Sequence, residues 1–204
     1  MLSGTVRVAI FVVEDKNPER EKMNRWKKSL EYIRSDYYRY VGRKDSLFTM
    51  WLYSFKNPCF NFSMWFRWAS YGVWGPVGKI FHQLAMRRTG IWIQARTQIG
   101  YGLYIGHGIG LVVNPTTRIG NNCNLSQFMT IGANNGKAAV IGDNVYIGPS
   151  VCIVEDVVIG DNATIGAGAV VVKDVPVNAT VAGVPARIVS YKTPGRYIGN
   201  RWKC

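Results

Sequence analysis

At 204 residues, with 48% hydrophobic and 18% charged side chains, the chain has a globular composition and is not a disordered protein. The formal net charge is +13, and Lys and Arg outnumber Asp and Glu by 16 to 7 in residues 1–90 but by only 9 to 5 in residues 91–204. A basic surface attracts nucleic acid, anionic lipid or a phosphorylated ligand. The sequence has no zinc-ligand spacing, no RNP-like aromatic motif and no run of five Lys or Arg residues, so we predict no nucleic acid partner.

The N-terminal region indicates a cytoplasmic protein. Its apolar run is too short for a signal peptide, and residues 1–22 are predicted to form a loosely attached arm. Met23 is a second candidate for the natural start. The four cysteines show no paired spacing, and unpaired thiols indicate a reducing compartment.

Residues 23–90 are predicted to form a small α-helical subdomain. Its first helix is the amphipathic stretch that begins at Met23 and is closed by Gly42. Two further helices are expected to begin near Asn57–Pro58 and near Gly75–Pro76, because proline suits the first helical turn.

The stretch from Leu47 to Met86 is rich in Trp, Phe and Tyr, but charged residues, Pro and Gly interrupt it too often for a membrane span. We expect its aromatic side chains to pack on the main domain or on another subunit. The alternative is a peripheral contact with the inner face of the membrane, with aromatic and basic side chains resting on the bilayer.

From residue 99 a six-residue period replaces the helical pattern. An aliphatic residue, often followed by Gly, recurs at Ile99, Ile105, Ile119, Leu125, Ile131, Ile141, Ile147, Ile153, Ile159, Ile165 and Val171. Such self-similarity predicts a solenoid in which each hexapeptide gives one short strand and one corner. Gly, Asn and Asp in the "GNN" and "GDN" triplets suit left-handed corners, and three hexapeptides make a triangular coil.

The period slips at two places, where we expect functional insertions. Ile105 and Ile119 are 14 residues apart rather than 12, and His107 lies two residues after Ile105. Ile131 and Ile141 are 10 residues apart rather than 6, which leaves an extruded loop, "GANNGKAAV". Stacking of the coils is expected to bring this loop near His107.

The sequence "IGYGLYIGHGIGLVV" and the closing "IGAGAVVVKDVPVNATVAGVPARIV" resemble the hexapeptide-repeat acyltransferases, in the branch of serine O-acetyltransferases and polysaccharide O-acetyltransferases. The resemblance covers about residues 90–190. It implies a left-handed parallel β-helix, an exception to the right-handed crossover rule, over residues 91–190, with 191–204 as a C-terminal tail. It also implies a homotrimer with active sites between subunits, for which a dimer of trimers is a further possibility.

The resemblance implies acetyl transfer from acetyl-CoA, without a metal, and His107 falls on the family's catalytic histidine. An imidazole with a pKa of about 6.5 can take the proton of an alcohol as the alcohol attacks the thioester. The flanking glycines leave room for both substrates.

The chain departs from the serine-specific enzymes around this histidine. Those enzymes hold the histidine with an aspartate at the position of Trp92 and carry another aspartate at the position of Gly106. Their loop also carries an Arg-His pair, which "GANNGKAAV" lacks. We therefore expect a sugar or a surface-polysaccharide intermediate as the acceptor, with a backbone carbonyl or Gln94 orienting His107, and we keep serine acetylation as the alternative.

The same resemblance suggests the residues that bind acetyl-CoA. Gly148 and Ala167 match positions that line the pantetheine arm, and Lys173, Arg187 and Lys137 are candidates for the phosphates.

Two other classes of protein can also contain a hexapeptide-repeat solenoid. A zinc carbonic anhydrase needs three histidine ligands, whereas this chain has only His82 and His107. A non-catalytic scaffold or binding module remains a second alternative, supported by Trp92 in place of the acid. His82, in a helical segment, is expected to be structural.

Overall fold

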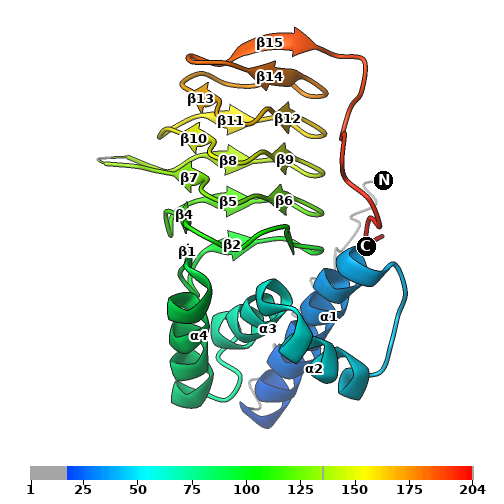
Figure 1. The fold of residues 1–204 in the computed structure, drawn as a ribbon. Helices are drawn as coiled ribbons and strands as arrows, with labels where there is room; N and C mark the ends of the chain where they lie inside the picture. Colours follow the sequence, from blue (N-terminus) through cyan, green and yellow to red (C-terminus); the bar gives the residue numbers. More distant parts are fainter. Residues whose placement is uncertain (1–17, 135, 204) are drawn as a thin grey trace, which may run out of the picture.

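The computed structural model describes residues 18–134 and 136–203, which form a helical base followed by a three-faced solenoid (Figure 1). The helices are α1 (Pro18–Val41), α2 (Leu47–Lys56), α3 (Pro58–Ser70) and α4 (Pro76–Thr89). They lie together at one end of the solenoid (Figure 1). Strands begin at Ile91, directly after the last helix.

Three of the helices follow the signals in the sequence. Gly42 ends α1 with a left-handed φ of 72°, Asn57 caps α3 through its side chain, and Pro76 opens α4. The helix α1 begins earlier than expected, at Pro18, while the remainder of the predicted arm, residues 1–17, lies outside the described residues. The helix α2 was missed, although Ser46 caps it by accepting a hydrogen bond from the Thr49 amide at 3.2 Å.

Three parallel ladders form the faces of the solenoid. Face A contains β1 (Ile91–Ile93), β4 (Leu111–Val113), β7 (Thr130–Ile131), β10 (Cys152–Ile153) and β13 (Val170–Val171). Face B contains β2 (Gln98–Ile99), β5 (Arg118–Ile119), β8 (Val140–Ile141) and β11 (Val158–Ile159). Face C contains β3 (Tyr104–Ile105), β6 (Asn124–Leu125), β9 (Tyr146–Ile147), β12 (Thr164–Ile165), β14 (Thr180–Ala182) and the antiparallel closing strand β15 (Arg187–Ser190).

The predicted aliphatic positions build the core. Each points inward and pairs with its equivalent in the next coil, as in the column Ile105, Leu125, Ile147, Ile165 and Val181 of face C. All of these side chains are buried, and each stabilises the fold by about 1.5–3 kcal/mol. The predicted left-handed β-helix preceded by helices is therefore confirmed.

A buried ion pair fixes the helical base to the first coil. Arg67 of α3 donates to Asp36 of α1 at 2.8 Å and to the carbonyls of Ile99 and Gly100, both at 2.7 Å. Asp36 in turn accepts a hydrogen bond from the Leu103 amide at 2.8 Å. Because both charges are buried and fully hydrogen-bonded, this contact holds the coil in one position on the helices.

The C-terminal segment returns along face C to the helical base (Figure 1). The Gly195 amide donates to the Asn162 carbonyl, and the side chain of Asn122 bonds both the amide and the carbonyl of Trp202. Arg39 of α1 donates to the Gly199 carbonyl at 3.0 Å. Within the described residues, no helix is long and apolar enough to cross a bilayer.

Candidate active site

His107 lies in the corner between β3 and β4, in the coil nearest the helices, and its side chain is exposed. The first slip of the period falls in this corner, because Val113, eight residues after Ile105, takes the inward position and pairs with Ile131. The corner therefore has two more residues than its equivalents in the following coils.

Backbone hydrogen bonds locate the two additional residues. The Gly106 amide donates to the Leu125 carbonyl at 3.1 Å, and the Phe128 amide donates to the Ile109 carbonyl at 2.9 Å. Residues 107–109 of the first coil consequently lie opposite Gln127 alone. The two additional residues therefore fall within 107–109, the segment that begins with the histidine.

The helical base supports this corner from below. A Cβ atom on Gly108 would lie 2.6 Å from Cδ1 of Ile91 and 3.0 Å from Sγ of Cys59 in α3, so only glycine fits there. Burial raises the pKa of the Cys59 thiol, which keeps it protonated at neutral pH.

Tyr40 of α1 fixes the strand that leads into the corner. Its hydroxyl donates to the Ile105 carbonyl and accepts from the Ile105 amide, both at 3.1 Å. Because β3 is the first strand of face C, no other strand bonds this side of Ile105. Burial raises the pKa of Tyr40 well above its usual value, so the hydroxyl stays a donor. No pattern in the sequence indicated Tyr40, because its partner is 65 residues away.

Gln127 and Phe128 were not predicted as site residues either, although their positions in the repeat indicate that they lie beside the His107 corner. Gln127 follows Leu125 by two residues, as His107 follows Ile105. Phe128 is exposed and packs over Gly110, where a Cβ atom would lie 2.6 Å from its ring. Both residues belong to the coil that stacks on the histidine corner.

No carboxylate or other acceptor is hydrogen-bonded to His107 within the described residues of the single chain. Trp92 lies on β1 beside Val112 of β4 and is 49% exposed. Gln94 follows the end of β1, whereas His107 precedes β4, which starts level with Ile91. The structure therefore places Gln94 beyond the opposite end of face A and does not bring it to His107.

Two of the predicted acetyl-CoA residues share the corner column of His107. Gly148 follows β9 and Ala167 follows β12, so both lie between faces C and A. A Cβ atom on Gly148 would lie 2.9 Å from the Ala167 amide nitrogen. Close stacking of the coils thus accounts for the glycine, while Ala167 is exposed on the outside of the corner.

The predicted cationic residues lie elsewhere. Lys137 and Lys173 are exposed at the corner between faces A and B, and Arg187 is exposed on β15. The loop that carries Lys137 projects from the solenoid between β7 and β8 (Figure 1). The expectation that stacking brings this loop near His107 is wrong for the single chain, because the two slips occur at opposite ends of face A.

His82 of α4 is buried between Phe62 and Phe66, with ring centroids 5.4 and 5.9 Å from its own. Burial lowers its pKa to about 4, so the side chain is neutral. This environment fits the predicted structural role.

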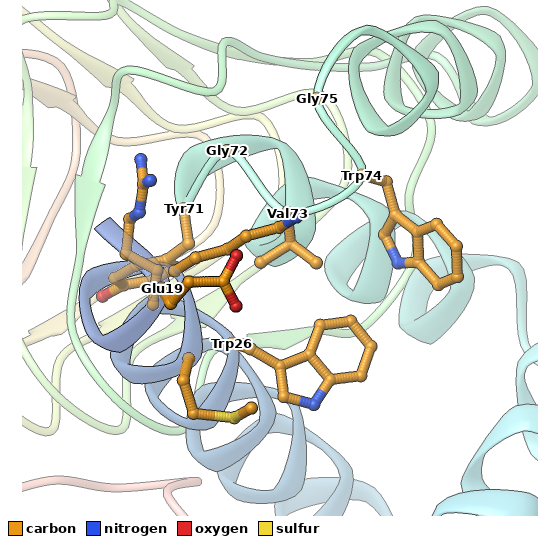
Figure 2. A pocket seen from close by; sticks show the side chains of 10 residues that line it. Glu19, Trp26, Tyr71, Gly72, Val73, Trp74 and Gly75 are labelled. Carbon is orange, nitrogen blue, oxygen red and sulfur yellow. The ribbon is translucent and has the colours of Figure 1, made fainter. Parts of the chain in front are cut away.

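Other features of the described residues do not add to the site. A cavity of about 760 Å³ lies in the helical base, where Trp26, Tyr71 and Trp74 line it (Figure 2). None of its lining residues belongs to the solenoid. Over residues 18–134 and 136–203, no group of three or more His, Cys, Asp or Glu side chains is placed to hold a metal ion.

Known proteins share both the repeat and the fold. The family described as bacterial transferase hexapeptide (six repeats) matches residues 138–173. A serine acetyltransferase of Staphylococcus xylosus is 38% identical over 127 residues, which cover 60% of this chain and 58% of that protein. The chain spans less than two thirds of the length of the curated relatives that it matches.

Two solved structures extend the likeness to the helical base. The Neisseria gonorrhoeae serine acetyltransferase in complex with serine has a TM-score of 0.68 and 28% identity, over 82% of this chain and 72% of that one. The Brucella abortus serine acetyltransferase in complex with coenzyme A has a TM-score of 0.66 and 27% identity, over 85% and 69%. The chain is therefore similar in sequence and in fold to the hexapeptide-repeat transferases, and among them to the serine acetyltransferases.

Proposed function

We propose that this protein is an acetyl-CoA-dependent O-acetyltransferase in which His107 is the general base. The observation that carries the proposal is the enlarged corner, which presents an exposed imidazole between two glycines at the foot of an open column of corners. Neutral imidazole is the side chain best suited to take the proton of an alcohol near neutral pH.

The transfer is direct. His107 takes the hydroxyl proton of the acceptor as the oxygen attacks the thioester carbonyl, which forms a C–O bond and a tetrahedral intermediate. Collapse of the intermediate breaks the C–S bond, and the imidazolium returns its proton to the departing thiolate. The products are an acetyl ester and CoA, and His107 ends neutral.

The relatives support acetyl-CoA as the donor, since one of them is solved with coenzyme A. In this chain Gly148 and Ala167 follow the column of corners upward from His107, as a long pantetheine arm requires. Lys173, Arg187 and Lys137 are exposed cations that suit the phosphates of the cofactor.

Serine is the acceptor that the comparisons favour, because the relatives described above are serine acetyltransferases and one is solved with serine. The residues at the site favour a second candidate, a sugar hydroxyl. Trp92 stands where the serine-specific enzymes carry the aspartate that holds the histidine, and Gly106 stands where they carry a second aspartate. The loop after β7 carries Lys137 but no Arg-His pair. A neutral sugar needs none of these charges.

We also propose that the protein works as a homotrimer, with a dimer of trimers as the larger form. In the single chain the His107 side chain is exposed and the loop after β7 lies at the far end of face A. A neighbouring subunit that places its own loop against the His107 corner would enclose the site. Analytical ultracentrifugation tests this, and a fully active monomer would contradict it.

An acceptor panel tests the proposed function. Release of CoA thiol from acetyl-CoA is measured with serine, nucleotide sugars and oligosaccharides, for the wild type and for His107→Ala. Acceptor-dependent release that is lost in His107→Ala supports the proposal, and the best acceptor decides between serine and sugar. No release of thiol above the uncatalysed background with any acceptor favours a binding or scaffold protein.

A further inference from the structure

Two helices of the base each expose a stripe of large apolar side chains. The stripe of α2 consists of Leu47, Phe48, Trp51, Leu52 and Phe55, and the stripe of α4 consists of Val77, Ile80, Phe81 and Leu84. Spacings of three and four residues keep each set on one side of its helix. Together these side chains form the α2–α4 face.

The two stripes form one surface. Trp51 and Phe55 of α2 line the same groove as Phe81 and Leu84 of α4, and the groove has a volume of about 370 Å³. Trp65 of α3 lies against Phe81, with ring centroids 4.5 Å apart and an angle of 15° between the planes. A continuous apolar surface of this kind marks an interaction site.

The charged residues of the segment that carries this surface, from α2 to α4, have a single sign. No Asp or Glu occurs anywhere between Asp45 and Asp143, a stretch that contains eight Lys and Arg residues. Within the helices of the face, Lys56, Lys79, Arg87 and Arg88 are exposed. The fifth cation of this region, Arg67, is buried against Asp36 and is already paired.

We infer that the α2–α4 face docks on an anionic lipid surface. The occupant must accept large apolar side chains and also supply negative charge, and an anionic bilayer does both at its headgroup boundary. A second copy of this chain fits less well, because a two-fold contact would set Lys79 and Arg88 against the same cations of the partner. The helices of the described chain cannot span the bilayer, so they would lie in its surface.

This inference does not depend on the catalytic role of His107. The geometry nevertheless connects the two, because Cys59 at the start of α3 packs against Gly108 beside the histidine. If the helical base rests on a membrane, the first coil and the His107 corner lie close to the lipid surface.

Vesicle flotation with the full chain tests the inference. Binding is compared on phosphatidylcholine vesicles and on vesicles that also contain phosphatidylglycerol, at low and at high salt. We expect binding only when phosphatidylglycerol is present and release by salt, because screening weakens the attraction between basic side chains and anionic headgroups.

Matched variants separate the two contributions. Phe48→Ser combined with Phe55→Ser removes two side chains that are 66% and 62% exposed, and binding should fall by at least about tenfold. Val177→Ser combined with Val189→Ser is the control, since these side chains are 53% and 61% exposed on the solenoid. Lys79→Glu with Arg88→Glu should also weaken binding, whereas Lys192→Glu with Arg196→Glu should not.

Circular dichroism confirms that each variant is folded, which is expected because the changed side chains are exposed. The inference is overturned if the folded wild type does not bind phosphatidylglycerol vesicles at low salt, or if the α2–α4 variants bind as well as their controls. It is also overturned if the face proves to join two copies, so that Phe48→Ser with Phe55→Ser lowers the oligomeric state while vesicle binding is unchanged.

Discussion

His107, the proposed general base, is held by residues that do not take part in the proposed chemistry. Gly108 packs on Ile91 and Cys59, and the Tyr40 hydroxyl is hydrogen-bonded to both the amide and the carbonyl of Ile105. The imidazole itself is exposed. A general base needs a backbone that is held in place and a side chain that both substrates can reach.

Tyr40→Phe should show that this support matters. Loss of the hydroxyl leaves the buried amide and carbonyl of Ile105 without a partner, so the free energy of unfolding should fall by about 1–3 kcal/mol. The turnover number should fall as well, because Ile105 leads into the His107 corner. Denaturant unfolding and steady-state kinetics measure the two effects.

Tyr37→Phe is the matched control for this change. The Tyr37 hydroxyl donates to Asp45 at 2.7 Å, and neither residue contacts β3 through a hydrogen bond of the described chain. This variant should lose stability and keep its turnover number. Equal turnover in Tyr40→Phe and Tyr37→Phe would show that Tyr40 is merely structural.

His82 should make stability depend on pH. Its folded pKa of about 4 lies below the usual value of about 6.5, so between these values the unfolded chain binds a proton that the folded chain does not. The stabilisation is complete above pH 6.5 and is lost as the pH falls toward 4. The loss is on the order of 3 kcal/mol, from about 1.4 kcal/mol for each pH unit.

Unfolding by denaturant at pH 7 and at pH 5, for the wild type and for His82→Phe, measures this contribution. The wild type should lose more stability than the variant on going to pH 5. If both lose the same amount, other groups account for the acid sensitivity.

At the scale of the elements, the corners show how much the repeat encodes. Asn122, Asn144, Asn162 and Asn178 occupy one corner in successive coils, all with φ between 55° and 64°. The "GNN" and "GDN" triplets predicted left-handed corners, and the first three of these residues lie within them. Asn accepts this conformation because its short side chain can bond locally.

Asn144→Ala should destabilise the protein by about 1–2 kcal/mol, since a left-handed residue with a plain Cβ is strained. Asn144→Gly should cost less, because glycine adopts this conformation without strain. The free energy of denaturant unfolding measures the difference. If alanine were as stable as glycine at position 144, the corner would not be under conformational constraint.

The elements also show where prediction from the sequence ends. The interval from Ile105 to Ile119 revealed two additional residues but not their place, because six plus eight and eight plus six both fit. Hydrogen bonds to the second coil assign them to the His107 corner. The helix α2 was missed because aromatic residues dominate the stretch from Leu47, although Ser46 and Thr49 carried its capping signal.

Contacts between distant segments could not be predicted. Arg67 was one basic residue among many in the sequence, yet in the fold it pairs with Asp36 and bonds two carbonyls of the first coil. Tyr40 reaches Ile105, and the tail reaches Asn122. A period of six describes stacking within the solenoid and contains no information about what packs against its end.

At the scale of the whole molecule, two surfaces remain for partners. The His107 corner is exposed in the single chain and is suited to completion by a neighbouring subunit. The α2–α4 face is apolar, has a basic border and lies on the helices that support the same coil. If both proposals hold, the His107 corner lies close to the lipid surface on which the helical base rests.

The central claim is that His107 takes the acceptor's proton during acetyl transfer. Acceptor-dependent release of CoA, measured for the full-length wild type and for His107→Asn at saturating acetyl-CoA, tests it most directly. The rate should fall by a factor of about 10²–10⁴ in the variant, while its circular dichroism and oligomeric state stay unchanged. A folded His107→Asn that keeps the wild-type rate would contradict the account.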